Sequence, residues 1–244
     1  MKPAALYAVY RRRNAAVLER LLAPARASGW TIGLWALDDP DPSLIDITTG
    51  SGPGMKFELV NRLLDTRAPG EGQQVLISDD DAAFFRGDVV AFARRAHAAN
   101  LDLAQPAHVW WSNISHRITW MRPFSRARLT TFVEIGPIFV VAPGWRDRIA
   151  PFPEDIGMGW GLELEWMKLR EDGCRLGIVD ATPIRHLTRF AAAYAPDDEI
   201  ARLTAQLEER GAPGWAGLRR TLATWRPWRS RPPWADHNRS SSRS

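Results

Sequence analysis

The chain has 244 residues, 45% of them hydrophobic and 25% charged, which are ordinary values for one large globular domain. No apolar run is long enough to cross a membrane and no signal-peptide cleavage site follows the N-terminus, so we expect a cytoplasmic protein. Cys174 is the only cysteine, which excludes an intrachain disulfide and agrees with a reducing compartment.

The net charge of +4 belongs to one end of the chain. Residues 225–244 contain five arginines and one aspartate, so their charge equals that of the whole chain and the remainder is neutral. A neutral body gives no reason to expect nucleic acid as a partner. The Arg, Pro and Ser content predicts a disordered basic tail over residues 226–244. Its arginines, with Trp228 and Trp234, suit a peripheral contact with an anionic membrane or an acceptor polymer.

Strands and helices alternate in the first half of the chain. The apolar pattern predicts strands at residues 4–9, 30–37, 74–78 and 102–105, and helices at 15–27, 57–64 and 88–99. A loop rich in Gly, Pro and Ser separates the second strand from the second helix. This alternation indicates an open, mainly parallel sheet in an α/β domain.

The second half is less regular. Aromatic and β-branched residues over 109–141 predict two or three antiparallel strands. A strand is expected at 175–180, and helices at 161–171, 196–210 and 215–225. We therefore expect one α/β domain over residues 1–190, C-terminal helices over 191–225 that pack on it, and the disordered tail.

Three consecutive aspartates, Asp79, Asp80 and Asp81, follow the predicted strand that ends at Ser78. Ligands of open α/β sheets bind beyond the carboxyl ends of the strands. Adjacent carboxylates repel one another, and a divalent cation such as Mg²⁺ or Mn²⁺ relieves that repulsion. The other interpretation is an acidic turn that caps the next helix.

The triplet resembles the Asp-x-Asp signature of GT-A glycosyltransferases. The resemblance implies a Rossmann-related mixed sheet flanked by helices in a single domain. It makes Asp81 the first metal ligand and Asp79 its partner, which contacts the ribose of the donor or a metal-bound water. Asp80 occupies the variable middle position of this substrate-binding motif and is expected to point elsewhere.

A second motif combines glycines with Trp160, Gly161 and Glu163. Glycine lets the backbone approach a ligand closely, and an indole offers a flat apolar face for a sugar ring. The segment resembles, in part, the Trp-Gly-Gly-Glu-Asp region of β-1,4-galactosyltransferases. The resemblance implies that Trp160 and Gly161 bind substrate. Leu164 stands where that motif has its catalytic Asp, so the role of general base is assigned to a neighbouring glutamate, with Glu163 preferred.

Two alternatives stay open for these glutamates. Glu163 lies in the first turn of the predicted helix, where a carboxylate also stabilises the helix dipole. Glu165 is the other candidate base, but its spacing to Lys168 suits a surface ion pair.

Three further residues complete the predicted site. His186 follows a strand and a loop that contains Pro183, and GT-A enzymes often supply a late His ligand there, although a lone loop His is usually a surface residue. Lys56 opens a helix whose N-terminal amides suit a diphosphate. Glu134 is a single acid in an apolar strand, where it needs a partner if buried and is placed to reach donor or acceptor.

The order of these motifs over residues from about 4 to 190 resembles an uncharacterised family of glycosyltransferase-like proteins. The motifs that carry this resemblance are the acidic triplet, Gln105-Pro106, Trp111-Ser112 up to His116, Phe132 to Ile135, Gly159 to Leu162, and Asp180 to His186. The resemblance implies transfer of a sugar from a nucleoside-diphosphate sugar to an unknown acceptor. The resemblance also implies Mn²⁺ or Mg²⁺ as the cofactor, and an imidazole beside carboxylates favours Mn²⁺. A metal-dependent nucleotidyl- or phosphotransferase, and a non-catalytic carbohydrate- or nucleotide-sugar-binding relative, are the alternatives.

Overall fold

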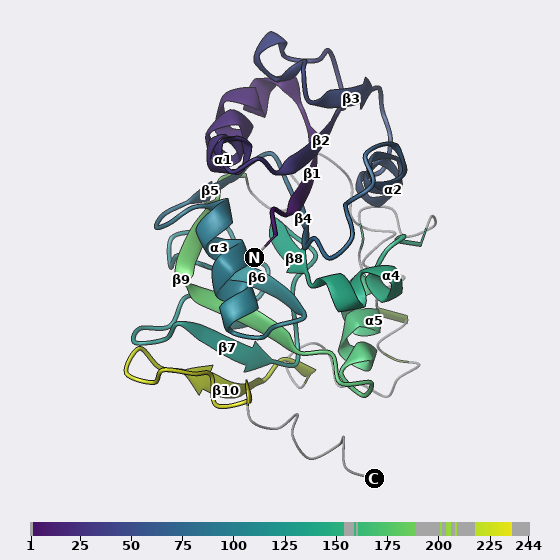
Figure 1. Cartoon of the computed structure of the whole chain (residues 1–244). Coiled ribbons are helices and arrows are strands. Elements are labelled where there is room, and N and C mark those ends of the chain that lie inside the picture. Colours follow the sequence, from purple (N-terminus) through teal and green to yellow (C-terminus); the bar gives the residue numbers. More distant parts are fainter. Residues whose placement is uncertain are drawn as a thin grey trace.

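The architecture is described from a computed structural model. It describes residues 2–153, 159, 161–188, 201, 204, 205, 208 and 218–235. Over these residues the chain forms one mixed sheet of ten strands with helices on both faces (Figure 1). The strand order is β10-β7-β9-β6-β8-β4-β1-β2-β3, and β5 pairs with β9 beside this path.

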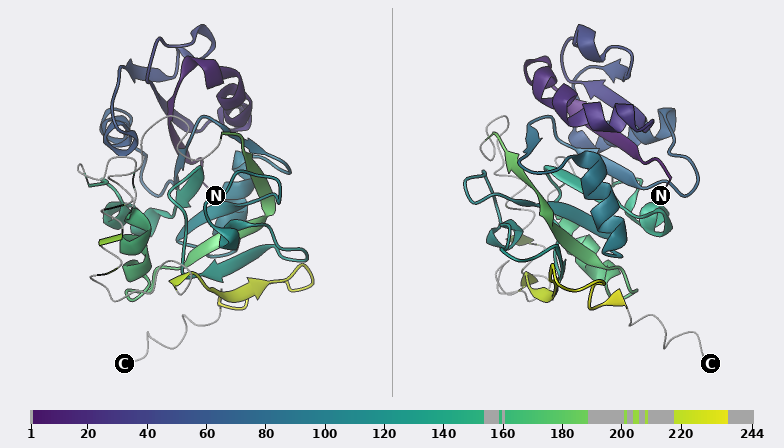
Figure 2. Two further views of the ribbon diagram at one scale, coloured as in Figure 1. Left: turned by 180° about the vertical axis from the view of Figure 1, so that it is seen from behind. Right: turned by 60° about the vertical axis from the view of Figure 1, so that its left-hand side comes forward.

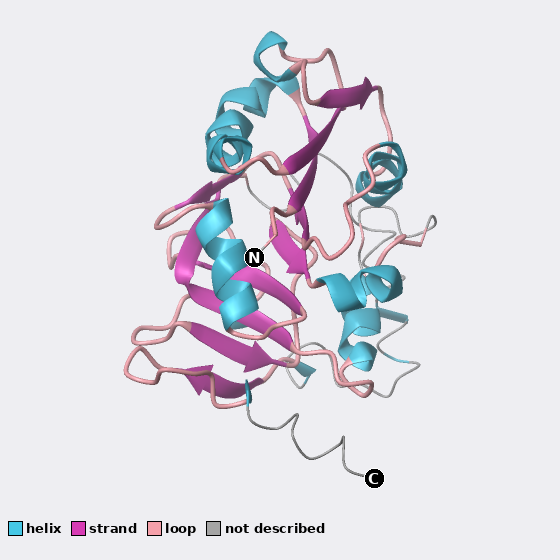
Figure 3. Cartoon of the chain, in the orientation of Figure 1, coloured by secondary structure: helices cyan, strands magenta, loops and turns pink. Residues whose placement is uncertain are grey.

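The strands are β1 (Ala5–Tyr10), β2 (Thr31–Ala36), β3 (Thr48–Ser51), β4 (Val75–Ser78), β5 (Ala82–Phe84), β6 (Leu103–His108), β7 (Ala127–Thr130), β8 (Ile138–Val141), β9 (Leu176–His186) and β10 (Thr221–Trp225). The α-helices are α1 (Ala15–Ala27), α2 (Lys56–Thr66), α3 (Val89–Ala98), α4 (Arg146–Ile149) and α5 (Leu162–Leu169). Figure 3 shows that the sheet, with β3 at one edge and β10 at the other, lies between two groups of helices.

Alternating side chains of the buried strands divide the core into two parts. In β1, Leu6 and Ala8 face α1 and α3, whereas Ala5 and Tyr7 face α2 and α5. Successive side chains of a strand point to opposite faces, so an almost wholly apolar strand such as β1 requires helices on both sides. The two helical layers are also visible from behind and from the side (Figure 2).

The first half agrees with the predicted α/β alternation. Helix α1 has the predicted bounds, and β1, β2, β4, α2 and α3 lie within a residue or two of theirs. Strands β1, β2 and β4 are parallel, as expected for β-α-β connections. Strand β3 was not predicted, because its residues are Thr, Gly and Ser at the sheet edge, where little apolar surface is buried.

The second half departs from the prediction most clearly at β9 and β10. Strand β9 continues through Pro183 to His186 instead of ending at residue 180, because its last three residues pair with β5. Residues 221–225, predicted as part of a helix, form β10 and pair antiparallel with β7. The predicted helix at 196–210 and most of residues 191–217 lie outside the described residues.

The first part of the expected tail packs on the domain. Trp234 is buried, and its indole N–H donates to the Ala99 carbonyl at 2.7 Å. Trp225 is also buried, and its indole donates to the Arg229 carbonyl at 2.9 Å. The expectation of disorder from residue 226 is therefore wrong as far as Ala235, since composition alone did not reveal these two anchors. Within the described residues, no helix is both long and apolar enough to cross a membrane.

Candidate functional site

The acidic triplet and His186 meet because β5 pairs with the end of β9. The chain leaves β4 at Ser78, passes the triplet and enters β5 at Ala82, which lies opposite His186. The Leu187 amide donates to the Asp81 carbonyl at 2.9 Å, which fixes this register. The segments that carry the triplet and His186 are thus held side by side.

Asp79, Asp81 and His186 each offer one atom that could bind a metal ion, and these atoms lie within 4.8 Å of one another. His186 Nε2 is 3.1 Å from Asp81 Oδ1. Burial alone would lower the pKa of His186, but the hydrogen bond and charge of Asp81 outweigh it and raise this pKa. For Asp81, burial acts to raise the pKa, and the bond and charge of His186 reverse the shift and lower it.

Asp80 points away from this group, as expected for the middle position. Its carboxylate accepts the Arg11 amide at 2.7 Å at the end of β1. Burial raises the pKa of Asp80 to about 6, although the bonds from Arg11 and the Asn14 side chain act in the opposite direction. The contact ties the triplet to the neighbouring strand, and it gives no support to the expected substrate contact of Asp80.

Lys56 joins the predicted diphosphate loop to the triplet. It is the first residue of α2 and is largely buried, and its Nζ lies 2.6 Å from Asp79 Oδ1 and 3.2 Å from the Ile135 carbonyl. A Cβ at Gly136 would lie 2.9 Å from Asp79 Oδ2 and 3.6 Å from Lys56 Nζ. A side chain at position 136 would therefore require the Asp79 carboxylate to shift.

Two buried glutamates lie near the group. Glu163 is in the first turn of α5, and its carboxylate accepts the Gly161 amide at 3.3 Å. Burial raises the pKa of Glu163 to about 7, and backbone N–H groups and Lys56 limit the rise. Burial, followed by the charge of Glu163, raises the pKa of Glu134 to about 8. At neutral pH, Glu134 is largely protonated and Glu163 is divided between its two forms.

Glu165, the other candidate base, lies on the outer side of α5. Its carboxylate pairs with Lys168 Nζ at 2.9 Å, and both side chains are about half exposed. This is the surface ion pair that the spacing predicted. Trp160 lies outside the described residues, so the structure adds nothing about its expected sugar contact.

The sequence analysis missed His108, which it gave no role. This buried residue ends β6, and its Nε2 is 3.7 Å from Glu134 Oε2. Its Nδ1 is 2.9 Å from Ser112 Oγ, which accepts the His186 amide at 2.8 Å. Burial lowers the pKa of His108 to about 3, so the ring is neutral. The predicted strand ended at residue 105, so nothing in the sequence indicated that His108 lies at the end of β6.

Arg219 was missed as well, and His116 belonged to a motif of the resemblance but was given no role in the site. His116 contacts the Arg219 guanidinium, which stacks over the Phe132 ring with its carbon 5.9 Å from the ring centroid. Burial lowers the pKa of Arg219, while the charges of Glu134 and Glu163 act against this shift. Arg219 thus lies within electrostatic reach of both glutamates. No local pattern signals this arginine, which comes from the segment before β10.

Asp180, within the motif that leads to His186, has a structural role. Its carboxylate is fully buried and accepts two bonds from Arg128, at 2.9 and 3.0 Å, and one from Ser125 Oγ at 2.6 Å. Arg128 is also fully buried. This bidentate pair fixes β7 against β9 and holds the strand that carries His186.

The sheet order, the two helical layers and the position of the acidic triplet define a mixed α/β fold of the GT-A glycosyltransferase type. Among solved structures, GalNAc-T7 with UDP, GalNAc and Mn²⁺ is similar with a TM-score of 0.55 and 10% identity, over 79% of this chain and 45% of that chain. S. aureus TarS in complex with UDP-GlcNAc is similar with a TM-score of 0.54 and 14% identity, over 88% of this chain and 68% of that one.

A TarS complex with UDP gives a TM-score of 0.52 at 13% identity. The chain spans less than half the length of the GalNAc-T7 structure. No protein-family model and no curated protein matches the sequence. At these identities the likeness shows the fold, and the chemistry has to be argued from the site itself.

Proposed function

We propose that the protein is a metal-dependent glycosyltransferase that moves a sugar from a nucleoside-diphosphate sugar to an acceptor hydroxyl. The observation that carries this proposal is the convergence of Asp79, Asp81 and His186 beyond the carboxyl end of β4. It occurs in the same fold as proteins that were solved with UDP or with UDP, GalNAc and Mn²⁺. The nucleotide sugar and the metal are the two parts of this proposal that need testing.

The donor set fits a divalent cation. Two carboxylate oxygens and one imidazole nitrogen lie within 4.8 Å of one another, and this combination suits Mn²⁺ better than Mg²⁺. Asp79, Asp81 and His186 would hold the ion, which when bound supplies positive charge to the leaving diphosphate. Without a cation, the same carboxylates repel a diphosphate, so donor binding should depend on the metal.

Lys56 is assigned to the diphosphate. An ammonium group has three N–H donors, and two of the Lys56 contacts are with Asp79 and the Ile135 carbonyl. We assign the third donor to a phosphate oxygen at the N-terminus of α2. This keeps the positive charge of Lys56 beside the metal ligands whether or not the donor is bound.

Glu163 is assigned as the general base of an inverting transfer. Its raised pKa of about 7 matches the pH at which a base is most effective. In the proposed step, the acceptor hydroxyl gives its proton to the Glu163 carboxylate and its oxygen bonds to the anomeric carbon. The bond from that carbon to the diphosphate breaks, and the diphosphate leaves with the electron pair. Glu134, protonated at neutral pH, donates a hydrogen bond to the acceptor.

A ligand panel tests the assignment. The melting temperature of the full chain is measured with uridine, guanosine and cytidine diphosphate sugars, with Mn²⁺ or with a chelator. We expect one nucleotide series to stabilise the protein, and only when Mn²⁺ is present. Nucleoside diphosphate release is then measured with candidate sugar acceptors.

The other outcomes identify the alternatives. Preference for nucleoside triphosphates, with release of pyrophosphate, would favour a nucleotidyltransferase. Stabilisation by a nucleotide sugar without turnover on any acceptor would favour a non-catalytic binding protein.

A further inference from the structure

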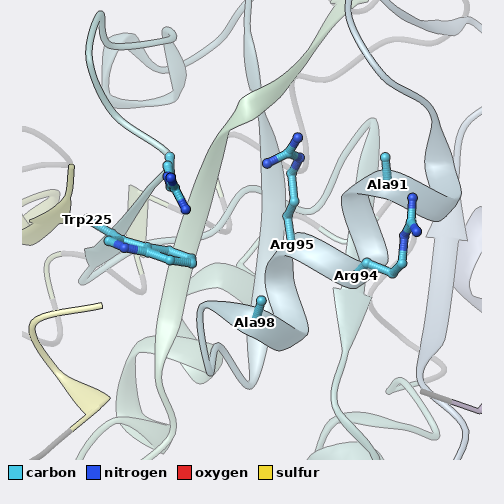
Figure 4. Close-up of a pocket in the computed structure, with 6 residues that line it drawn as sticks. Ala91, Arg94, Arg95, Ala98 and Trp225 are labelled. Carbon is cyan, nitrogen blue, oxygen red and sulfur yellow. The ribbon is translucent and has the colours of Figure 1, made fainter. Parts of the chain in front are cut away.

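A pocket of about 290 Å³ lies between α3 and the edge of the sheet, on a part of the molecule that the proposed reaction does not use (Figure 4). Arg94 and Arg95 come from α3, Arg126 precedes β7, and Trp225 ends β10. Two alanines complete the described lining, which contains no acidic side chain. The described lining thus brings three arginines together with no acidic side chain among them.

The pocket continues into a rim of exposed arginines and aromatic rings. The Arg126 guanidinium lies 5.2 Å from the centroid of the Trp225 ring and donates to the Pro227 carbonyl at 2.8 Å. Arg226 donates to the Phe124 carbonyl at 3.3 Å, which joins the loop before β7 to the loop after β10. These two loops thus form one continuous surface with the pocket.

Phe124 and Trp228 project from this rim. They are 72% and 71% exposed, the highest values among the large hydrophobic side chains described. Phe124 has a φ of 54°, in the left-handed region that a residue with a bulky side chain rarely adopts. Strain of this kind is found where a function requires the conformation, and here it presents an apolar ring at a loop tip.

The surrounding chain carries only positive charge. Residues 117–130 contain four arginines and residues 219–231 contain five, and neither segment contains an acid. Arg128 is neutralised by Asp180, and Arg219 lies near the glutamates of the site. The arginine–aromatic surface is defined here as Arg94, Arg95, Arg122, Arg126, Arg226, Phe124 and Trp228.

We propose that the arginine–aromatic surface docks the protein on an anionic lipid bilayer. The pocket arginines bind lipid phosphate groups, and Phe124 and Trp228 enter the headgroup region. Arginines alone would fit any polyanion, but exposed aromatic rings among them are the pattern of an interfacial membrane site. The proposal replaces the expected contact through Trp234, which is buried. It does not depend on the proposed enzymatic function.

Vesicle co-sedimentation of the full chain at low salt tests this proposal. The vesicles contain phosphatidylcholine alone or phosphatidylcholine with phosphatidylglycerol, and we expect binding to the anionic vesicles only. Arg94→Gln with Arg95→Gln should weaken this binding roughly thirtyfold, from the usual contribution of two interfacial arginines. The control is Arg20→Gln with Arg62→Gln, which removes the same charge from α1 and α2 and should bind like the wild type.

A second pair of variants separates a bilayer from other anions. Phe124→Ser with Trp228→Ser should lose vesicle binding while the melting temperature stays near that of the wild type, since both rings are exposed. Unchanged vesicle binding in this pair, or equally tight arginine-dependent binding to soluble polyphosphate, would overturn the bilayer proposal in favour of a polyanion site. Displacement of the protein from vesicles by millimolar inorganic phosphate, or failure of the wild type to bind anionic vesicles, would also overturn it.

Discussion

Glu134→Gln should stabilise the protein increasingly as the pH rises. Burial, with the nearby charge of Glu163, raises the pKa of Glu134 from 4.5 to about 8. Between these values the folded protein holds a proton that the unfolded chain releases, so the buried carboxyl lowers the free energy of unfolding as the pH increases. The amide cannot ionise, and the variant lacks this loss.

The magnitude follows from the pKa difference. At about 1.4 kcal/mol for each pKa unit, the complete effect is about 5 kcal/mol. Most of it develops between pH 5 and pH 8, where the advantage of the variant should grow by about 3 kcal/mol. Because total stabilities are typically only about 5–15 kcal/mol, a change of this size is readily measured.

The assay is urea unfolding of both proteins at several pH values, with a chelator present so that metal binding does not contribute. Glu58→Gln is the control, because this glutamate is exposed on α2 and pairs with Arg62 at the surface. Its difference from the wild type should be small at every pH. A Glu134→Gln advantage that does not change with pH would show that Glu134 ionises as an exposed glutamate does, and it would refute this description of the site.

Three more predictions concern the base and the packing. Glu163→Gln should reduce turnover roughly 10²–10⁴-fold with donor affinity nearly unchanged, and normal turnover in this variant would exclude Glu163 as the base. Wild-type turnover should rise about tenfold from pH 6 to pH 8 as Glu163 ionises. Asp180→Asn should lower the free energy of unfolding by about 3–5 kcal/mol in urea unfolding because it leaves Arg128 buried without its counter-charge, and a near-neutral change would contradict this. Trp234→Ala should cost about 3–5 kcal/mol in the same assay, whereas a freely moving tail would show no loss.

The spacing of apolar residues predicted the helices and strands whose side chains repeat with a clear period, such as α1 and β4. Helix α1 buries Leu18, Leu21 and Leu22 at helical spacing, and β4 is a short apolar run that ends at the triplet. These signals are repeated within one element and need no information about distant partners. The place of the triplet at a strand end indicated a ligand site, and the resemblance to the Asp-x-Asp signature selected Asp79 and Asp81 as its metal-ligand candidates.

The features that were missed depend on pairing between distant segments. Leu218, Leu222 and Trp225 have helical spacing, but antiparallel pairing with β7 makes residues 221–225 a strand. His186 was expected in a loop, and its position is set by pairing with Ala82, more than 100 residues earlier. His108 and Arg219 reach the glutamates from other distant segments. Local spacing contains no information about such contacts.

The most direct test of the proposed metal site is calorimetric titration of a nucleoside diphosphate, with UDP as the first probe, into wild type and Asp81→Ala. The wild type should bind with Mn²⁺ present and lose binding in a chelator. Asp81→Ala should lose at least the roughly tenfold that even outer-shell changes cost in metal affinity. Asp147→Ala, which removes an exposed acid on α4, is the control and should bind normally. Tight diphosphate binding that needs no metal and is unchanged in Asp81→Ala would contradict the account.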